Sequence, residues 1–419
     1  MGHASAVRSA VPNSVVADWV LPIDASPIRR GTVTAAGGRI VSVGSTEAGA
    51  VDLGHVALLP ALVNAHTHLE LSHLHGCVPF GPTFVHWVRA QLALRRGAPA
   101  DPQEAATASR RALADAVATG TGLFGDVSND LTTTRLFREA AVRAVVFHEL
   151  LGFRGADADA RLAAAPGWSG WPSDDVRMSL APHAPYSVSP ALFRGIRRSR
   201  DTAPGARTTV HLAESPEEVE FIRDGTGPWR TMLEDFGVWD PTWQPPGCSP
   251  VEYVASLGLL DAQVLAVHGV QCSPADVGRL RASGATLVTC PRSNRLVGVG
   301  EAPLAAFYEA RVPVAIGTDS LASAPDLNLF QELAAVRMIA PDVAPRAMLE
   351  SATRVGADAL GYPDMGRLVA GAAAAVIAVQ LPAGIGGRTA DDVEEYLVSG
   401  ITPDRVQWVW PAPAPAHPA

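Results

Sequence analysis

The sequence contains no lysine, and all 33 of its basic residues are arginine. This absence excludes a lysine Schiff base and the lysine of a phosphate-binding P-loop. It also excludes a carbamylated lysine that bridges two metal ions. Any metal centre in this chain must therefore be built without lysine.

Cysteine is scarce as well. The four cysteines lie far apart, at Cys77, Cys248, Cys272 and Cys290. Because no C-x-x-C pair occurs, they indicate the reduced thiols of a cytosolic protein and not a disulfide framework.

The N-terminal segment lacks the apolar stretch of a signal peptide, and no run of about 18 apolar residues could form a membrane span. We therefore expect a cytoplasmic protein.

Positive charge is in the minority, since the formal net charge is −9. The composition, with 47% hydrophobic and 18% charged residues, is typical of a soluble globular protein. The acidic balance disfavours a nucleic acid or an anionic membrane as the main partner. A nucleic-acid-binding module is therefore the weakest of the functional classes considered.

Eight apolar segments of strand length recur along the chain, separated by segments with helical spacing. They cover residues 58–68, 122–129, 143–152, 176–185, 208–215, 264–271, 286–294 and 312–320. Strands that alternate with helices indicate a parallel sheet, and eight repeats favour an α/β fold of the closed (β/α)₈ TIM-barrel type. Continuous apolar runs also fit strands that are buried on both faces.

Short β-like pieces, separated by glycine and proline, precede and follow this pattern. We expect the N- and C-terminal segments to pair in a small β-sandwich domain. The predicted boundaries are 1–58 and 361–410 for the β domain, 59–360 for the barrel and 411–419 for a proline-rich disordered tail.

Polar residues gather where the predicted strands end, and the pair His66 and His68 ends the first of them. Side chains at positions i and i+2 of a strand point the same way, so these two imidazoles should converge. His211 ends the fifth strand and Asp319 ends the eighth. In barrels of this type the active site lies at the C-terminal ends of the strands.

Three imidazoles and one carboxylate form a ligand set suited to one Zn²⁺ ion, with Fe²⁺ as the other candidate. Each residue also has a structural interpretation. His211 alone could be a hydrogen-bonded core histidine, and Asp319 alone could cap a helix. Their joint position at the ends of barrel strands favours the metal site.

Glu214 follows His211 by three residues and could reach both a bound water and a substrate. Zinc lowers the pKa of its water towards ~7, and a nearby glutamate can take that proton and pass it to a ring nitrogen. A solvated glutamate at a helix start is the alternative, and we assign that role to Glu217, Glu218 and Glu220. His268 ends the sixth strand, where it could orient the water or serve as a buried structural residue.

The motifs NAHTHLE, APHAPYSVSP, VHLAES, VHGV, CPRSN and GTDSLAS occur between about residues 55 and 360. In this order and spacing they resemble the metal-dependent amidohydrolase superfamily, and within it the subgroup that deaminates adenine-type rings. The resemblance implies a small-molecule substrate and one divalent metal held by His66, His68, His211 and Asp319. It further implies that Asp319 accepts a proton from the water, that Glu214 shuttles protons and that His268 orients the nucleophile.

The same resemblance implies that His183 contacts the substrate, and it makes a homodimer a family expectation. Three further stretches, GTGPWRTMLEDFGVW, WQPPGCSPVEYV and GTDSLASAPDLNLFQEL, are similar to the aminodeoxyfutalosine deaminases of menaquinone biosynthesis. Their substrate joins an adenine nucleoside to a benzoate, so we expect a cation to meet the carboxylate. Arg292 is the candidate, with pairing to a structural carboxylate as the alternative. Trp87 and Trp229 could stack on substrate rings or belong to the core.

Three other functions remain open. The same site would serve a deaminase of S-adenosylhomocysteine or adenosine, or a hydrolase of a triazine or another heterocycle, because fold and metal do not select the substrate. A barrel that has lost activity and serves as a scaffold is the non-enzymatic alternative.

The irregular segment 239–250 is expected to form a loop over the site.

Overall fold

The structure is a computed structural model that describes residues 13–45, 48–97, 101–171, 173–385 and 388–411. The tail predicted at 411–419 lies outside these residues, apart from position 411. Among the described residues, no helix has the length and apolar character needed to cross a membrane.

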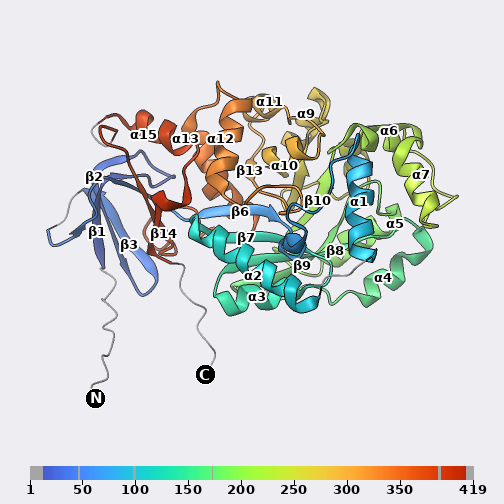
Figure 1. Ribbon diagram of the computed structural model, residues 1–419, viewed down its shortest axis with the longest axis horizontal. Helices are drawn as coiled ribbons and strands as arrows, with labels where there is room; N and C mark the ends of the chain where they lie inside the picture. The colour runs from blue at the N-terminus through green and yellow to red at the C-terminus, as the bar shows by residue number, and fades with distance from the viewer. Residues whose placement is uncertain (1–12, 46–47, 98–100, 172, 386–387, 412–419) are drawn as a thin grey trace, which may run out of the picture.

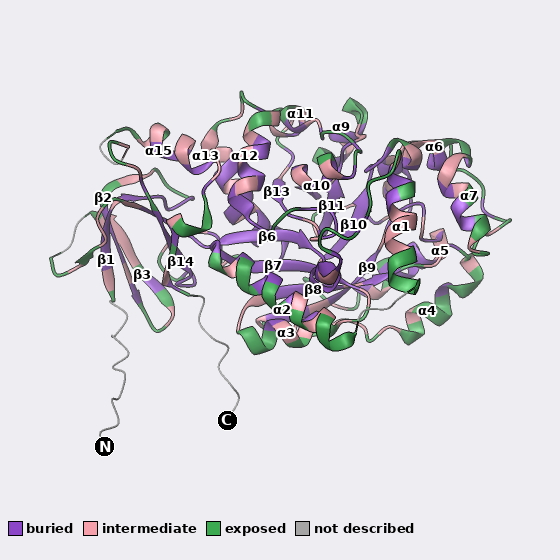
Figure 2. Ribbon diagram, in the orientation of Figure 1, coloured by how far each residue is buried: buried purple, intermediate pink, exposed green. Residues whose placement is uncertain are grey.

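Eight parallel strands form a barrel, which confirms the predicted fold class. They are β6 (Leu62–Thr67), β7 (Thr121–Ser128), β8 (Arg143–Leu150), β9 (Val176–Pro182), β10 (Thr208–Leu212), β11 (Val264–His268), β12 (Thr286–Thr289) and β13 (Val314–Ile316). Hydrogen bonds join neighbouring strands into two parallel arcs of four strands each. The first runs in the order β6-β7-β8-β9 and the second in the order β10-β11-β12-β13. Figure 1 shows both arcs on one side of the molecule, and Figure 2 shows that their strands are buried almost throughout.

The two arcs meet at both edges. On one side, the amide of His211 donates to the carbonyl of His183, over 2.9 Å. On the other, the amides of Thr318 and Asp319 both donate to the carbonyl of His66, over 3.0 Å each. A Cβ atom on Gly317 would lie 2.8 Å from the Cβ of His66, so only glycine allows the first and last strands to approach this closely.

Helices follow the strands and cover the barrel. The longer ones are α1 (Phe84–Gly97), α2 (Pro102–Ala118), α3 (Thr132–Ala140), α4 (Ala158–Ala164), α5 (Pro190–Arg200), α6 (Pro216–Asp224), α7 (Gly227–Asp235), α8 (Pro250–Ser256), α9 (Pro274–Ser283) and α12 (Leu329–Ile339). Shorter ones are η1 (Leu69–Leu74), η2 (Gly155–Asp157), α10 (Pro291–Leu296), α11 (Leu304–Glu309), α13 (Pro345–Glu350), η3 (Ser351–Val355) and α14 (Gly356–Ala359). Their exposed faces point away from the strands in Figure 2.

Sequence signals fix where many of these helices begin. Ser189, Ser215, Ser249 and Ser273 each accept a hydrogen bond from a backbone amide in the first helical turn, and each precedes a proline. A serine cap satisfies an amide that has no partner within the helix, and proline at the first helical position lacks such an amide. The chain therefore enters these helices at defined points, which fixes the length of the segments that lead into them.

The segments at the two ends of the chain form the second domain. Its strands are β1 (Ser14–Val20), β2 (Ile28–Ala36), β3 (Arg39–Ser45), β4 (Val51–Asp52), β5 (Val56–Pro60), β14 (Val376–Gln380) and β15 (Val406–Trp410). They are hydrogen-bonded into one seven-stranded sheet in the order β15-β14-β5-β1-β2-β3, with β4 on β1. Figure 1 shows β14, from the C-terminal segment, in the same domain as β1, β2 and β3, with α15 (Ala390–Leu397) close by; η4 (Pro403–Arg405) precedes β15.

Candidate active site

The structure brings His66, His68, His211 and Asp319 together at the C-terminal end of the barrel. The Nε2 atoms of His68 and His211 lie 3.3 Å apart. Asp319 Oδ1 lies 3.8 Å from His66 Nε2 and 3.6 Å from His68 Nε2. Residues separated by about 250 positions in the sequence thus present nitrogen and oxygen atoms to a single point.

This cluster has the chemistry of a metal site. Both ring nitrogens of His66 are buried without a hydrogen-bond partner, although buried polar atoms normally have one. Candidate ligand atoms of His66, His68 and Asp319 lie within 4.8 Å of one another, and the same holds for His66, His211 and His268. Nitrogen ligands with one carboxylate suit zinc and related divalent ions.

Neighbouring groups orient the candidate ligands. The Nδ1 atom of His211 donates to the carbonyl of His183 over 2.9 Å, which leaves Nε2 free to bind a cation. Asp319 Oδ2 accepts hydrogen bonds from the hydroxyls of Ser293 and Ser323, and its Oδ1 accepts one from the amide of Ser320. Burial lowers the pKa of His211 to about 3, so its imidazole is neutral, as a metal ligand must be.

Glu214 and His268 lie beside this cluster, as the sequence predicted. Glu214 Oε1 is 3.6 Å from His268 Nε2, and both side chains are buried. His268 Nδ1 contacts the side-chain oxygen of Asn294 at 2.8 Å. If Nδ1 carries the proton, Nε2 is left as an acceptor that faces Glu214. Burial and the nearby carboxylate of Asp319 raise the pKa of Glu214 well above its usual value.

Glu218 does not lie in solvent, so its assignment as a solvated residue is wrong. It is fully buried, and its carboxylate accepts hydrogen bonds from the amides of Ala213 (2.9 Å) and Glu214 (2.8 Å). Ala213 has a positive φ of 51°, which is unusual for a residue other than glycine. Glu218 therefore holds the strained turn that carries Glu214.

We expect Glu218→Gln to lower kcat about tenfold while bound metal stays constant. The side-chain NH2 group of glutamine would face one of the two backbone N–H donors, so one of the two hydrogen bonds is lost and the turn at Glu214 loosens. Steady-state kinetics and metal content measure the effect, with partly exposed Glu220→Gln as the control. A tenfold rise in KM at constant kcat would contradict a role in positioning Glu214.

A cavity opens outward from the cluster. Its lining includes His68, His183, His211, Glu214, His268 and Asp319 at the inner end, and Leu71, Phe84, Trp87, Tyr186, Trp229 and Met232 on the walls. The structure thus brings His183, Trp87 and Trp229 to the cavity, as the sequence suggested. Tyr186 and Trp229 stack with ring centroids 3.7 Å apart, and the indole N–H groups of Trp87 and Trp229 have no partner.

Glu149 is a residue of this cavity that the motifs did not reveal. It is buried at the end of β8, and its Oε1 has no hydrogen-bond partner and lies 3.6 Å from His211 Nδ1. Its Oε2 accepts a hydrogen bond from the side-chain amide of Asn129 over 2.9 Å. The alternation of side chains along β8 could have identified this residue. Val145 and Phe147 point into the barrel, and Glu149 lies on the same face of the strand.

Arg292 does not contribute to the cavity lining. Its guanidinium forms two hydrogen bonds with Asp326, of 2.8 and 2.9 Å, and lies 3.6 Å from buried Glu332. The structure therefore pairs Arg292 with carboxylates of the protein, which was the alternative to a contact with the substrate. A substrate carboxylate would have to displace a bidentate partner to reach it.

The segment 239–250 does not cover the cavity, which corrects the sequence expectation. Trp243 is only 7% exposed and stacks on Phe221 with ring centroids 4.9 Å apart, and Trp239 packs on Phe153. Aromatic burial thus draws the segment onto the flank of the barrel. Side chains of α1 and α7 line the cavity in its place.

We expect Trp243→Ala to lower the free energy of unfolding by about 3–5 kcal/mol, because it leaves a cavity against Phe221. Urea unfolding followed by circular dichroism measures the change. Phe80→Ala is the control, since that ring is 69% exposed. Equal effects of the two variants would show that the stack contributes no stability.

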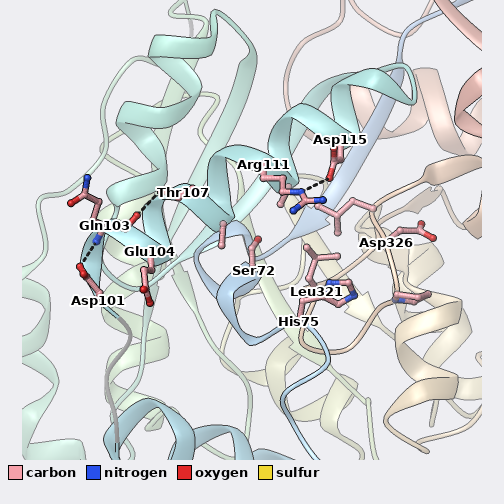
Figure 3. A pocket seen from close by; sticks show the side chains of 14 residues that line it. Ser72, His75, Asp101, Gln103, Glu104, Thr107, Arg111, Asp115, Leu321 and Asp326 are labelled. Carbon is pink, nitrogen blue, oxygen red and sulfur yellow. Dashed lines mark hydrogen bonds and ion pairs between the residues drawn. The ribbon is translucent and has the colours of Figure 1, made fainter.

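A second hollow, of about 710 Å³, lies beside η1 and α2. Figure 3 shows its polar lining, in which Arg111 reaches Asp115, and Ser72 and His75 lie between α2 and Asp326. None of the clustered histidines lines it. The chemistry of the chain is therefore gathered in the aromatic-walled cavity and not in this larger groove.

Comparisons with known proteins agree with this geometry. The aminodeoxyfutalosine deaminase of Deinococcus radiodurans is 32% identical over 325 residues, which cover 73% of each chain. The 5-methylthioadenosine/S-adenosylhomocysteine deaminase of Halobacterium salinarum is also 32% identical, over 83% of this chain and 78% of the relative. Both relatives are enzymes named for the removal of an amino group.

A solved structure extends the similarity over nearly the whole chain. The adenosine deaminase of Xanthomonas campestris with bound zinc has a TM-score of 0.75 and 25% identity, over 94% of this chain and 90% of its own. The family model described as "Amidohydrolase family" matches residues 57–406. The chain therefore belongs to the amidohydrolase family, and it is a hydrolase of carbon–nitrogen bonds other than peptide bonds.

Proposed function

We propose that this protein is a metal-dependent deaminase of adenine-type nucleosides and that its substrate is aminodeoxyfutalosine. The observation that carries the proposal is the position of Glu214 and His268 beside the histidine cluster, at the inner end of an aromatic-walled cavity. Aromatic walls suit a planar heterocycle, and buried acid–base groups suit its hydrolysis. The relative from Deinococcus radiodurans supports the choice of nucleoside.

In this proposal His66, His68, His211 and Asp319 bind one divalent ion, with Zn²⁺ favoured by the donor set. When bound, the ion supplies a water acidic enough to act as a nucleophile near neutral pH. His183, which lies in the cavity lining, contacts the substrate, and Trp87 forms part of the wall against its rings.

The reaction replaces the ring amino group with oxygen. Water forms a bond to the ring carbon, the carbon–nitrogen bond breaks and the nitrogen leaves as ammonia. Asp319 Oδ1 accepts one proton from the water and passes it to the departing amino nitrogen, and His268 Nε2 accepts a hydrogen bond that orients the water. Glu214 delivers a proton to the neighbouring ring nitrogen, which makes the carbon more electrophilic, and takes up the second proton of the water as the carbon–oxygen double bond forms.

Ammonia release from a panel of substrates tests the proposal. Zinc-loaded protein is incubated with aminodeoxyfutalosine, S-adenosylhomocysteine, adenosine, guanine and a triazine, beside a Glu214→Gln control. Highest kcat/KM for aminodeoxyfutalosine, lost in the variant, is the expected result. Preference for another ring would overturn the substrate, and no turnover of any compound with metal bound would overturn the deaminase.

A further inference from the structure

The cavity has one wall of polar groups, which leads from the histidine cluster to the protein surface. Glu149 Oε1 lies 3.6 Å from His211 Nδ1, and the side-chain amide of Asn129 donates to Glu149 Oε2 over 2.9 Å. The guanidinium of Arg95 then donates to the side-chain oxygen of Asn129 over 3.5 Å. A substrate whose ring is held at the cluster would extend along this wall towards Arg95.

Arg95 is the one arginine among the described residues that line the cavity. It lies near the end of α1, and its side chain is 36% exposed, so a ligand in the cavity can reach it. Since the chain has no lysine, no other side chain of fixed positive charge in the described part of the chain borders this space. The cavity therefore has imidazoles and carboxylates at its inner end, aromatic rings on its walls and one guanidinium at its rim.

The present partners of Arg95 leave most of its hydrogen-bonding capacity unused. Its nearest carboxylate is Glu70 Oε1, at 3.7 Å, and its bond to Asn129 is long at 3.5 Å. Glu70 accepts hydrogen bonds from Ser128 and the backbone amide of Asn129 through Oε2, while its Oε1, the atom that faces Arg95, lies beyond hydrogen-bond distance. A guanidinium has five N–H donors in a planar fork, and a carboxylate binds two of them at once.

We propose that Arg95 binds a carboxylate on the outer part of the substrate and thereby selects anionic nucleosides over neutral ones. This inference rests on the proposed function, and it names the class of substrate that the same site prefers. Arg292 lacks access to the cavity, whereas Arg95 is open to it. The long guanidinium side chain also allows the contact to form without a change in the barrel.

The test compares two ligands that differ only in this charge, aminodeoxyfutalosine and its neutral carboxamide. We expect the native protein to favour the acid by about 10–100-fold in kcat/KM, which is the range for a charged hydrogen-bonded contact. Arg95→Gln should reduce this ratio to about one, mainly through KM. Arg96→Gln is the matched control, because Arg96 neighbours Arg95 on α1 but packs over the Phe236 ring.

An acid-to-amide ratio that is unchanged in Arg95→Gln would overturn the inference. Failure of the proposed function is distinguishable from this result. If the native protein hydrolyses other nucleosides but neither of these two, both compounds are measured as inhibitors. Tighter inhibition by the acid that disappears in Arg95→Gln would then uphold the role of Arg95, and equal inhibition would refute it.

Discussion

Replacing Glu214 with glutamine is expected to lower kcat by about 10²–10⁴-fold, the usual contribution of a positioned acid–base group. The amide keeps the size of the side chain but cannot pass a proton between water and a ring nitrogen. The hydrogen bonds that fix the turn come from the backbone amides of Ala213 and Glu214, so the substitution leaves them in place. KM should change little, because the loss is in the transition state.

Metal content and the unfolding transition are the controls for this variant. Both should match those of the native protein, since Glu214 is not among the candidate ligands. A variant that retains more than a third of native kcat would rule out Glu214 as the proton shuttle. Loss of bound metal together with activity would instead show that Glu214 acts as a ligand.

Removal of the metal is expected to abolish activity and to destabilise the protein. The two ring nitrogens of His66 have no hydrogen-bond partner within the protein, and the barrel edges meet at this residue. An ion that binds only the folded chain stabilises it by about 4 kcal/mol when its concentration is 1,000 times Kd. A chelator should therefore lower Tm measurably, and added Zn²⁺ should restore both Tm and ammonia release.

His66→Ala should reproduce the chelated state and show no response to added metal. His75→Ala is the matched control, because this histidine is exposed in the neighbouring segment and lies outside the cavity. Chelator-treated protein with undiminished activity would refute a metal-dependent reaction. An equal loss of metal in both variants would show that the ion is bound elsewhere.

The sequence predicted which strands carry the cluster because strand ends in a parallel barrel share one face. The alternation of side chains along a strand explains why His211 points inward from β10. The same alternation along β8 predicts that Glu149 points inward. It does not explain His66, because Val63 and Ala65 point into the barrel and His66 should face outward. The pairing of β6 with β7 shifts register between Asn64 and Thr67, and such an irregularity re-aims the side chains that follow.

Two other positions depend on the backbone rather than on alternation. His268 has φ of 76° and Asp319 has φ of 60°, both in the left-handed region that residues other than glycine rarely adopt. These conformations turn the two side chains towards the cluster. No local pattern marks them, since the hydrogen bonds that hold them, such as that from Asp319 to His66, cross the fold.

Partners distant in sequence account for the remaining differences. Arg292 pairs with Asp326, a residue beyond the next strand, and α1 lies over the cavity although its sequence contains no site motif. Glu218 looked like one of several helix-start glutamates, and only its burial separates it from Glu220. Such choices are decided by tertiary packing, which outweighs the local signal.

Closure of the barrel has a consequence for the order of events on the ribosome. His66 and His68 leave the exit tunnel early, but Asp319 and the amides that bond to the carbonyl of His66 follow about 250 residues later. At a translation rate of roughly 5–20 residues per second, Asp319 is synthesised tens of seconds after His66 and His68. The four proposed metal ligands can therefore come together only once the last barrel strand has been synthesised, so we expect metal loading to follow translation of the whole barrel.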